Sequence, residues 1–189
     1  MEMTGAMDLY TVPGCRVGVR PPTEADTTAS AEAVRRSEHI SRWNPADPND
    51  LPDLIRRQGD TFRTFLVVDI AEGALAGRIN VSNIVRARFC NASLGYDAYT
   101  PYAGTGRMTE ALALVIDRAF AADGLALHRL EINVQPGNDA SIALARRMGF
   151  RYEGFTPRML FLNDAWRDHE RFALTAEEWP GAEKTILPS

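Results

Sequence analysis

The feature that most constrains this chain is a pair of glycines, Gly104 and Gly106, between a strand-like and a helix-like segment. The strand pattern ends near Tyr99, and the helix pattern begins at about Arg107. Glycine lets the backbone approach a ligand closely, and the first turn of a helix offers unpaired N–H groups and the positive end of the helix dipole. The segment therefore predicts a binding site for a phosphate or pyrophosphate group.

The length and composition predict one globular domain. The chain has 189 residues, of which 45% are hydrophobic and 24% charged, and no linker-like stretch divides them. We expect a disordered or loosely ordered N-terminal segment over residues 1–14, a single domain over residues 15–180 and a tail over residues 181–189. The chain after Thr175 is expected to be poorly ordered.

Charge, hydropathy and cysteine content exclude several classes of protein. The net charge of −4 gives no basic footprint for nucleic acid. No apolar run approaches the ~20 residues of a membrane-spanning helix, and the first ten residues lack the pattern of a secretory signal. Two cysteines, Cys15 and Cys90, do not make a disulfide framework, so we expect a cytoplasmic protein.

The hydrophobic periodicity predicts the order of the elements. The predicted strands cover residues 16–20, 64–70, 75–85, 88–99, 127–135, 151–162 and 165–174. The predicted helices cover residues 23–37, 54–58 and 107–122, and a last helix is capped by Asn138 and stops at Gly149. This order predicts a mixed α/β fold in which helices cover both faces of a twisted sheet and the strands before residue 100 form an antiparallel meander.

The two best-known nucleotide-binding patterns do not fit the glycine pair. A dinucleotide-binding fold needs G-x-G-x-x-G near its first strand, with an acidic residue on the next strand. A P-loop needs a lysine followed by serine or threonine directly after its last glycine, and the chain has no such sequence. Both patterns fail, so the expected phosphorylated cofactor is of another kind.

The residues around the glycine pair resemble a known family. The frame Ala103–Met108 (AGTGRM), followed by Thr-Glu-Ala-Leu, is similar to the Q/R-x-x-G-x-G/A signature of the GNAT family of acetyl-CoA-dependent N-acetyltransferases. It departs from the signature at Ala103, where the family has Gln or Arg, and at Met108, where the family has a small residue. Since backbone N–H groups carry the phosphate contacts in such a turn, these departures weaken the recognition more than the chemistry.

The second half of the chain strengthens the resemblance. Leu127–Phe150 is similar to the later strand and helix of the family, and Phe161–His169 (FLNDAWRDH) resembles the RimJ/RimL subgroup, whose members acetylate the N-terminal α-amines of ribosomal proteins. The resemblance extends over about residues 16–179. It implies a GNAT-like, largely antiparallel sheet of about seven strands that is splayed in the middle.

The resemblance implies a set of residues that bind acetyl-CoA. Backbone groups of Ala98 and Tyr99 would pair with the pantetheine arm, and Asn138 would bond to the same arm. The N–H groups from Gly104 to Met108 would hold the pyrophosphate. The implied cofactor-binding residues are Ala98, Tyr99, Gly104, Thr105, Gly106, Arg107, Met108, Asn138 and Ser141. Asn138 is also a competent helix N-cap whatever the chain does.

Acetyl transfer also needs a proton acceptor for the amine and a proton donor for the departing thiolate. Glu131, on the polar face of a predicted strand, is the candidate base, and Ser141 is the candidate donor because Ala145 stands where the family commonly has a tyrosine. Trp43 is a candidate for the acceptor pocket. We expect His169 to order the last hairpin rather than transfer protons. No histidine has metal-ligand spacing, so no metal is expected.

The expected function is direct acetyl transfer to a primary amine, because no cysteine is placed to form an acyl-enzyme. A protein N-terminal α-amine, as in ribosomal proteins, is the first candidate acceptor. A small-molecule amine (polyamine, amino acid or antibiotic) is the alternative, and so is a CoA-binding sensor or interaction module without turnover. A homodimer is left open.

Overall fold

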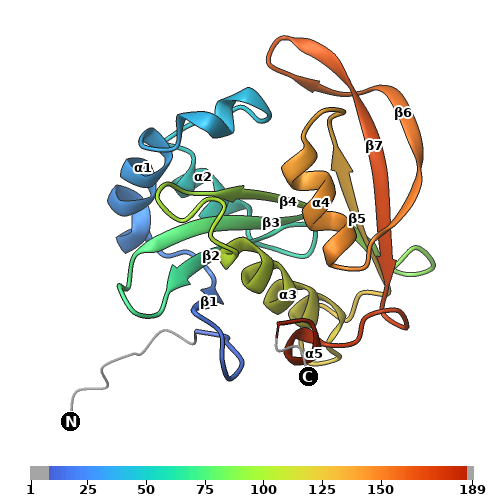
Figure 1. Cartoon of the computed structure of the whole chain (residues 1–189), viewed down its shortest axis with the longest axis horizontal. Helices are drawn as coiled ribbons and strands as arrows, with labels where there is room; N and C mark the ends of the chain where they lie inside the picture. Colours follow the sequence, from blue (N-terminus) through green and yellow to red (C-terminus); the bar gives the residue numbers. More distant parts are fainter. Residues whose placement is uncertain (1–8, 187–189) are drawn as a thin grey trace.

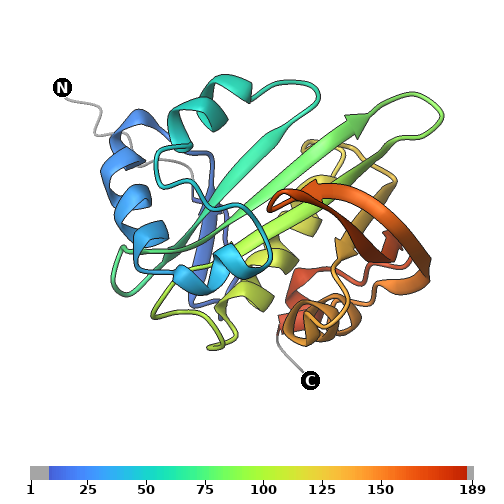
Figure 2. The same ribbon diagram turned by 90° about the horizontal axis from the view of Figure 1, so that it is seen from above.

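A computed structural model describes residues 9–186 and shows a single twisted sheet covered by helices on both faces (Figures 1 and 2). The sheet has seven strands in the order β1-β2-β3-β4-β5-β7-β6. The strands are β1 (Val17–Arg20), β2 (Arg63–Asp69), β3 (Leu75–Val85), β4 (Asn91–Ala98), β5 (Arg129–Val134), β6 (Arg151–Leu162) and β7 (Ala165–Thr175). Every neighbouring pair is antiparallel except β4 and β5. The predicted mixed α/β fold with a largely antiparallel seven-stranded sheet is confirmed.

The helices separate into two layers. The α-helices are α1 (Thr27–Arg35), α2 (Leu51–Arg57), α3 (Arg107–Phe120), α4 (Asp139–Arg147) and α5 (Ala182–Ile186), and two 3₁₀ turns are η1 (Glu24–Asp26) and η2 (Glu38–Arg42). Side chains of successive strand residues point to opposite faces, and on β2 Leu66 packs in the core under α1 and α2 while Val67 packs in the core under α3. Each face of the first half of the sheet therefore has its own hydrophobic core.

The sheet opens between β4 and β5, in the middle of the fold. The parallel pairing joins Asn91–Leu94 to Arg129–Ile132 and then stops, although β4 continues to Ala98. A parallel pair needs a crossover connection, and α3 supplies it. The gap beyond Leu94 is the splay that the family resemblance implies, and it leaves backbone groups of both strands without a strand partner.

The C-terminal part differs from the predicted loose tail. Beyond β7 the chain turns back over α3: the Trp179 indole N–H donates to Asp117 Oδ1 at 2.5 Å, and the Ala182 N–H donates to the same oxygen at 3.0 Å. Residues 111–116 of α3 are apolar and buried on every side of the helix, so the side that faces away from the sheet must be covered by another segment. Helix α5 contributes to it. Residues 187–189 lie outside the described part of the chain.

The N-terminal prediction is tested only in part. Residues 1–8 lie outside the described range. Within it, Tyr10 forms an isolated antiparallel bridge with Val19 of β1, so the sheet is extended by one residue pair. The predicted helix over residues 23–37 begins as the 3₁₀ turn η1, and the predicted fourth strand begins only at Asn91, after a turn.

Candidate active site

A cavity of about 690 Å³ lies where the sheet is splayed. We divide its lining into two parts. The turn half consists of Ala103, Gly104, Gly106, Met108 and Thr109 at the start of α3, together with Tyr96 and Ala98 of β4 and Asn138 and Ser141 of α4. The strand half consists of Glu131, Asn133 and Gln135 from β5 and the residues that follow it, with His169 of β7 and Trp43 after η2.

Unpaired backbone N–H groups dominate the turn half. Gly104 has φ +77° and Gly106 has φ +85°, a left-handed conformation that side chains disfavour. Within residues 9–186, no acceptor bonds the N–H groups of Gly104, Gly106, Arg107 or Met108. The Thr105 N–H differs, because it donates to the Tyr102 carbonyl at 3.2 Å. Four of the five amides from Gly104 to Met108 are thus free for an anion.

Side chains around the turn hold its shape. The Arg107 guanidinium pairs with Asp69, whose carboxylate is 1% exposed, and lies 5.1 Å from the centre of the Tyr102 ring. This pairing lowers the pKa of Asp69. The Arg107 side chain is therefore committed to the end of β2, and only its backbone N–H is available to a ligand.

Strand β4 presents Ala98 to the splay but not Tyr99. The Tyr99 N–H donates to the Ala76 carbonyl on β3 at 2.9 Å, and the Tyr99 carbonyl accepts from Ala103 at 2.9 Å, so both backbone groups are engaged. The Tyr99 side chain is fully buried in the core under α1 and α2. Because neighbouring residues of a strand direct their backbone groups to opposite edges, those of Ala98 face the gap. The prediction that Tyr99 pairs with a pantetheine arm does not fit this geometry.

Helix α4 brings a serine and a tyrosine together at the gap. Asn138 caps the helix by accepting from the Ser141 N–H at 3.3 Å, which leaves its amide NH₂ free. Ser141 Oγ lies 2.6 Å from the Tyr96 hydroxyl of β4. Burial raises the pKa of Tyr96 to about 12. Sequence analysis missed Tyr96, whose only signal is that it shares a face of β4 with Ala98.

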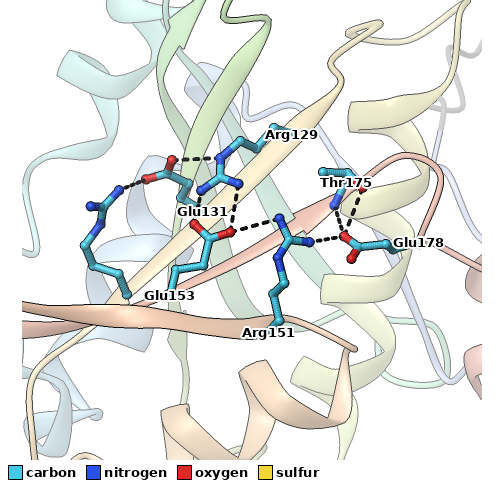
Figure 3. A network of polar contacts seen from close by, with 7 residues as sticks. Arg129, Glu131, Arg151, Glu153, Thr175 and Glu178 are labelled. Carbon is cyan, nitrogen blue, oxygen red and sulfur yellow. Dashed lines mark hydrogen bonds and ion pairs between the residues drawn. The ribbon is translucent and has the colours of Figure 1, made fainter.

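Glu131 lies in a network of ion pairs at the strand half (Figure 3). Arg129 Nε lies 3.0 Å from Glu131 Oε1, and Arg171 Nη2 lies 3.4 Å from Oε2. Arg129 also pairs with Glu153 of β6 and holds the pKa of that carboxyl below its usual range. Both oxygens of Glu131 therefore already accept from a cation. These ion pairs favour a structural role for Glu131, which links β5 to β7, over a role as catalytic base. Glu131 nevertheless lines the cavity.

Two hydrogen bonds hold the segment Ser41–Trp43, whose Trp43 lines the strand half; we call this segment the roof. The Gln135 side-chain N–H donates to the Trp43 carbonyl at 2.6 Å, and the Asn163 side-chain N–H at the end of the β6–β7 hairpin donates to the Ser41 carbonyl at 3.1 Å. Arg42 lies 4.9 Å from the centre of the Trp43 ring. The structure thus places Trp43 in the cavity lining, and one hydrogen bond links it to Gln135, the residue after β5.

His169, predicted to order the last hairpin, reaches the cavity as well. Its Nδ1 lies 3.0 Å from the Arg167 carbonyl, and the residue is 2% exposed. Over residues 9–186 the histidines, cysteines, aspartates and glutamates form no cluster of three or more that could hold a metal ion. Within the same range no helix is both long and apolar enough to cross a membrane.

Comparison with known proteins agrees with this geometry. The family described as "Acetyltransferase (GNAT) domain" matches residues 16–151. The [Ribosomal protein uS5]-alanine N-acetyltransferase of Escherichia coli is 36% identical over 126 residues, which are 66% of this chain. The match spans 63% of that relative, less than two thirds of its length.

Solved structures cover more of the chain. The structure of Mycobacterium smegmatis RimJ in complex with CoA-disulfide superposes with a TM-score of 0.79 and 30% identity, over 93% of this chain and 90% of that one. The ribosomal-protein-S5-alanine acetyltransferase of Vibrio fischeri gives a TM-score of 0.78 and 27% identity, over 90% and 98%. These comparisons confirm the resemblance to RimJ/RimL proteins, and the chain belongs to the GNAT acetyltransferase family.

Proposed function

We propose that this protein is a cytoplasmic N-acetyltransferase that moves an acetyl group directly from acetyl-CoA to a primary amine, with a protein N-terminal α-amine as acceptor. The observation that carries the proposal is the set of four unpaired N–H groups at Gly104, Gly106, Arg107 and Met108, in the same cavity as Ser141. Bound acetyl-CoA supplies the thioester that makes the acetyl carbon reactive.

The turn half fits the cofactor. A Cβ added at Gly104 would meet no atom within 4 Å, so the turn that carries the free amides is open at this position. The Ala98 N–H faces the gap in which an extended pantetheine arm can lie between β4 and β5, whereas the Ala98 carbonyl bonds to His39. The free NH₂ of Asn138 lies at the same gap. These residues bind and orient the cofactor, and the solved RimJ complex with CoA-disulfide supports the assignment.

Ser141 is the proton donor of the proposed reaction. The hydroxyl of Tyr96 is protonated at neutral pH, as an ordinary phenol is, and burial raises its pKa further, to about 12. Tyr96 can therefore donate to Ser141 Oγ, which directs the serine hydroxyl hydrogen to the leaving sulfur. Ser141 then delivers a proton to the thiolate and recovers one from solvent. Tyr96 is a positioning residue in this scheme.

The strand half receives the amine. Trp43 and Gln135 bound it on one side, and Glu131 supplies negative charge that two arginines balance. No cysteine lines this cavity in the described part of the chain, which favours a ternary complex over an acyl-enzyme. The named activity of the Escherichia coli relative, an alanine N-acetyltransferase acting on ribosomal protein uS5, supports a protein N-terminus as acceptor.

A single assay tests the proposal. The protein is mixed with acetyl-CoA and peptides varied at their first two residues, with N-acetylated copies of the same peptides as controls, and thiol release and peptide mass are measured. We expect acetylation of the α-amine and none of the blocked peptides. Transfer to spermidine or lysine in preference to every peptide would replace the acceptor class, and CoA binding without any transfer would favour a sensor.

A further inference from the structure

His169 is a nearly fully buried histidine in the strand half, and the transfer described above gives it no role. It lies on β7, between β6 and β5 in the sheet, with Thr156 of β6 as its strand partner. Its exposed fraction is 2%, yet it lines the cavity. A role limited to ordering the hairpin accounts for its bond to the Arg167 carbonyl but not for its position in the cavity.

The hydrogen bond of one ring nitrogen fixes the state of the other. The Arg167 carbonyl oxygen, 3.0 Å from His169 Nδ1, can only accept, so Nδ1 carries the hydrogen. In the neutral ring Nε2 then has a lone pair. Between residues 9 and 186 no group bonds Nε2, and Nε2 is not among the enclosed side-chain atoms that lack a partner. The cavity thus contains an imidazole nitrogen that is ready to accept a proton.

The environment keeps this ring neutral at pH 7. Burial lowers the pKa of His169 below 6.5, and the bond to Arg167 and the charge of Asp168 offset this only in part. Arg171, two residues further along the same face of β7, forms an ion pair with Glu131, so the Glu131 carboxylate is not free to pair with His169. No unpaired carboxylate of the cavity lining therefore stabilises a protonated His169.

The other titratable groups of the lining are less suited to accept a proton. They are His39, Tyr96, Asp97, Glu131 and Arg147. Asp97 lies 3.2 Å from Arg78, and both oxygens of Glu131 bond to arginines. His39 Nε2 donates to the Ala98 carbonyl at 3.0 Å, which leaves Nδ1 with a lone pair, but His39 is exposed to solvent, whereas His169 is 2% exposed. Burial raises the pKa of the Tyr96 phenol to about 12, so it keeps its own hydrogen, and a guanidinium has donors but no acceptor.

We propose that His169 Nε2 is the group that takes the proton from the acceptor amine. This inference rests on the proposed function. Asn133 of β5 lines the same cavity, and its Oδ1 is enclosed and has no partner among residues 9–186. The amine nitrogen bonds to the acetyl carbon while the carbon–sulfur bond breaks. Its proton passes to Nε2 and on to solvent, and the sulfur is protonated through Ser141.

The candidate amines differ in how readily they lose a proton. An α-ammonium group has a pKa of about 8 and a lysine or polyamine ammonium about 10.4. Because burial lowers the pKa of His169 below its usual range, proton transfer to it is uphill from both, and by roughly 2.4 units more from an alkylammonium. This difference belongs to the amines and favours N-terminal α-amines, independently of how the pocket fits the rest of the peptide.

The variant His169→Asn tests the assignment, because the asparagine NH₂ can replace Nδ1 as donor to the Arg167 carbonyl while the titrating nitrogen is lost. We expect kcat for an acceptor peptide to fall about 100-fold, and the acidic limb of the kcat–pH profile to disappear. CoA affinity, measured by calorimetry, should stay within twofold of wild type. The matched control is His128→Asn, since His128 is exposed, pairs with Glu177 and lies outside the cavity; it should retain the wild-type profile.

Two further measurements make the result decisive. In ¹⁵N-labelled wild-type protein without ligand, Nε2 of His169 should resonate as an unprotonated nitrogen at pH 7. A protonated Nε2, or a His169→Asn enzyme with the wild-type rate and pH profile, would overturn the assignment. Loss of the acidic limb in Glu131→Gln but not in His169→Asn would transfer the role to Glu131. If the wild-type protein binds CoA and acetylates no amine, the proposed function itself fails.

Discussion

The two halves of the cavity present different chemical groups to a ligand. The turn half is mainly backbone: four free N–H groups around two glycines, all within five residues of the chain. The strand half consists mainly of side chains from β5, from β7 and from the residues that follow η2 and β5. These residues are spread over more than 120 positions of the sequence. A backbone site recognises a feature common to every molecule of one cofactor, whereas a side-chain site can change its acceptor without disturbing the fold. This difference predicts that a side chain added to the glycine turn lowers CoA affinity, whereas loss of a side-chain contact of Trp43 in the strand half raises the KM for the acceptor.

The largest effect should follow from a side chain at the turn. Gly104→Val puts a branched residue at φ +77° in the turn that carries the free amides, where it strains the left-handed backbone and occupies open space. Loss of two charge-assisted hydrogen bonds to a diphosphate corresponds to a loss of CoA affinity on the order of 1000-fold. Calorimetric titration with CoA measures it.

A control substitution at another glycine distinguishes the effect of backbone strain from the effect of losing the phosphate-binding turn. Gly181 has φ +100°, also with no atom within 4 Å of an added Cβ, and it does not line the cavity. Gly181→Val should lower the thermal midpoint in the same way as Gly104→Val and leave CoA affinity at the wild-type value. Equal CoA affinity in both variants would mean that the diphosphate binds elsewhere.

The contrast between local backbone groups and distant side chains also explains which parts of the site the sequence could predict. The glycine turn, the helix after it and the Asn138 cap are local features, so their pattern is visible in adjacent residues. Sequence cannot decide between Ala98 and Tyr99, because one step along a strand reverses which edge the backbone groups face, and the structure bonds the Tyr99 N–H to β3. Tyr96 and Ser141 are 45 residues apart and Gln135 and Trp43 are 92 apart, so neither contact has a local signal. The fold and the turn half were predictable, but the pairing of side chains in the strand half was not.

A smaller effect, confined to chemistry, should follow from loss of the proton donor. We expect Ser141→Ala to lower kcat by about 100-fold while CoA affinity stays within a few-fold of wild type. Tyr96→Phe should lower kcat less, and the double variant should be no slower than Ser141→Ala alone, because Tyr96 acts through the serine. Steady-state kinetics with an acceptor peptide measures all three. Additive losses would show that Tyr96 acts on its own.

The smallest effect should follow from loosening the roof of the strand half. Gln135→Ala removes the hydrogen bond to the Trp43 carbonyl, and one such bond contributes about 0.5–1.5 kcal/mol. We therefore expect the KM for the acceptor peptide to rise about 3- to 10-fold, with little change in kcat and none in CoA affinity. Gln58→Ala is the control, since Gln58 donates to the Leu54 carbonyl at 3.3 Å, accepts from the Thr64 N–H at 3.2 Å and lies away from the cavity. A rise in the KM for acetyl-CoA instead of the peptide would contradict the division of the cavity into two halves, because the roof would then belong to the cofactor.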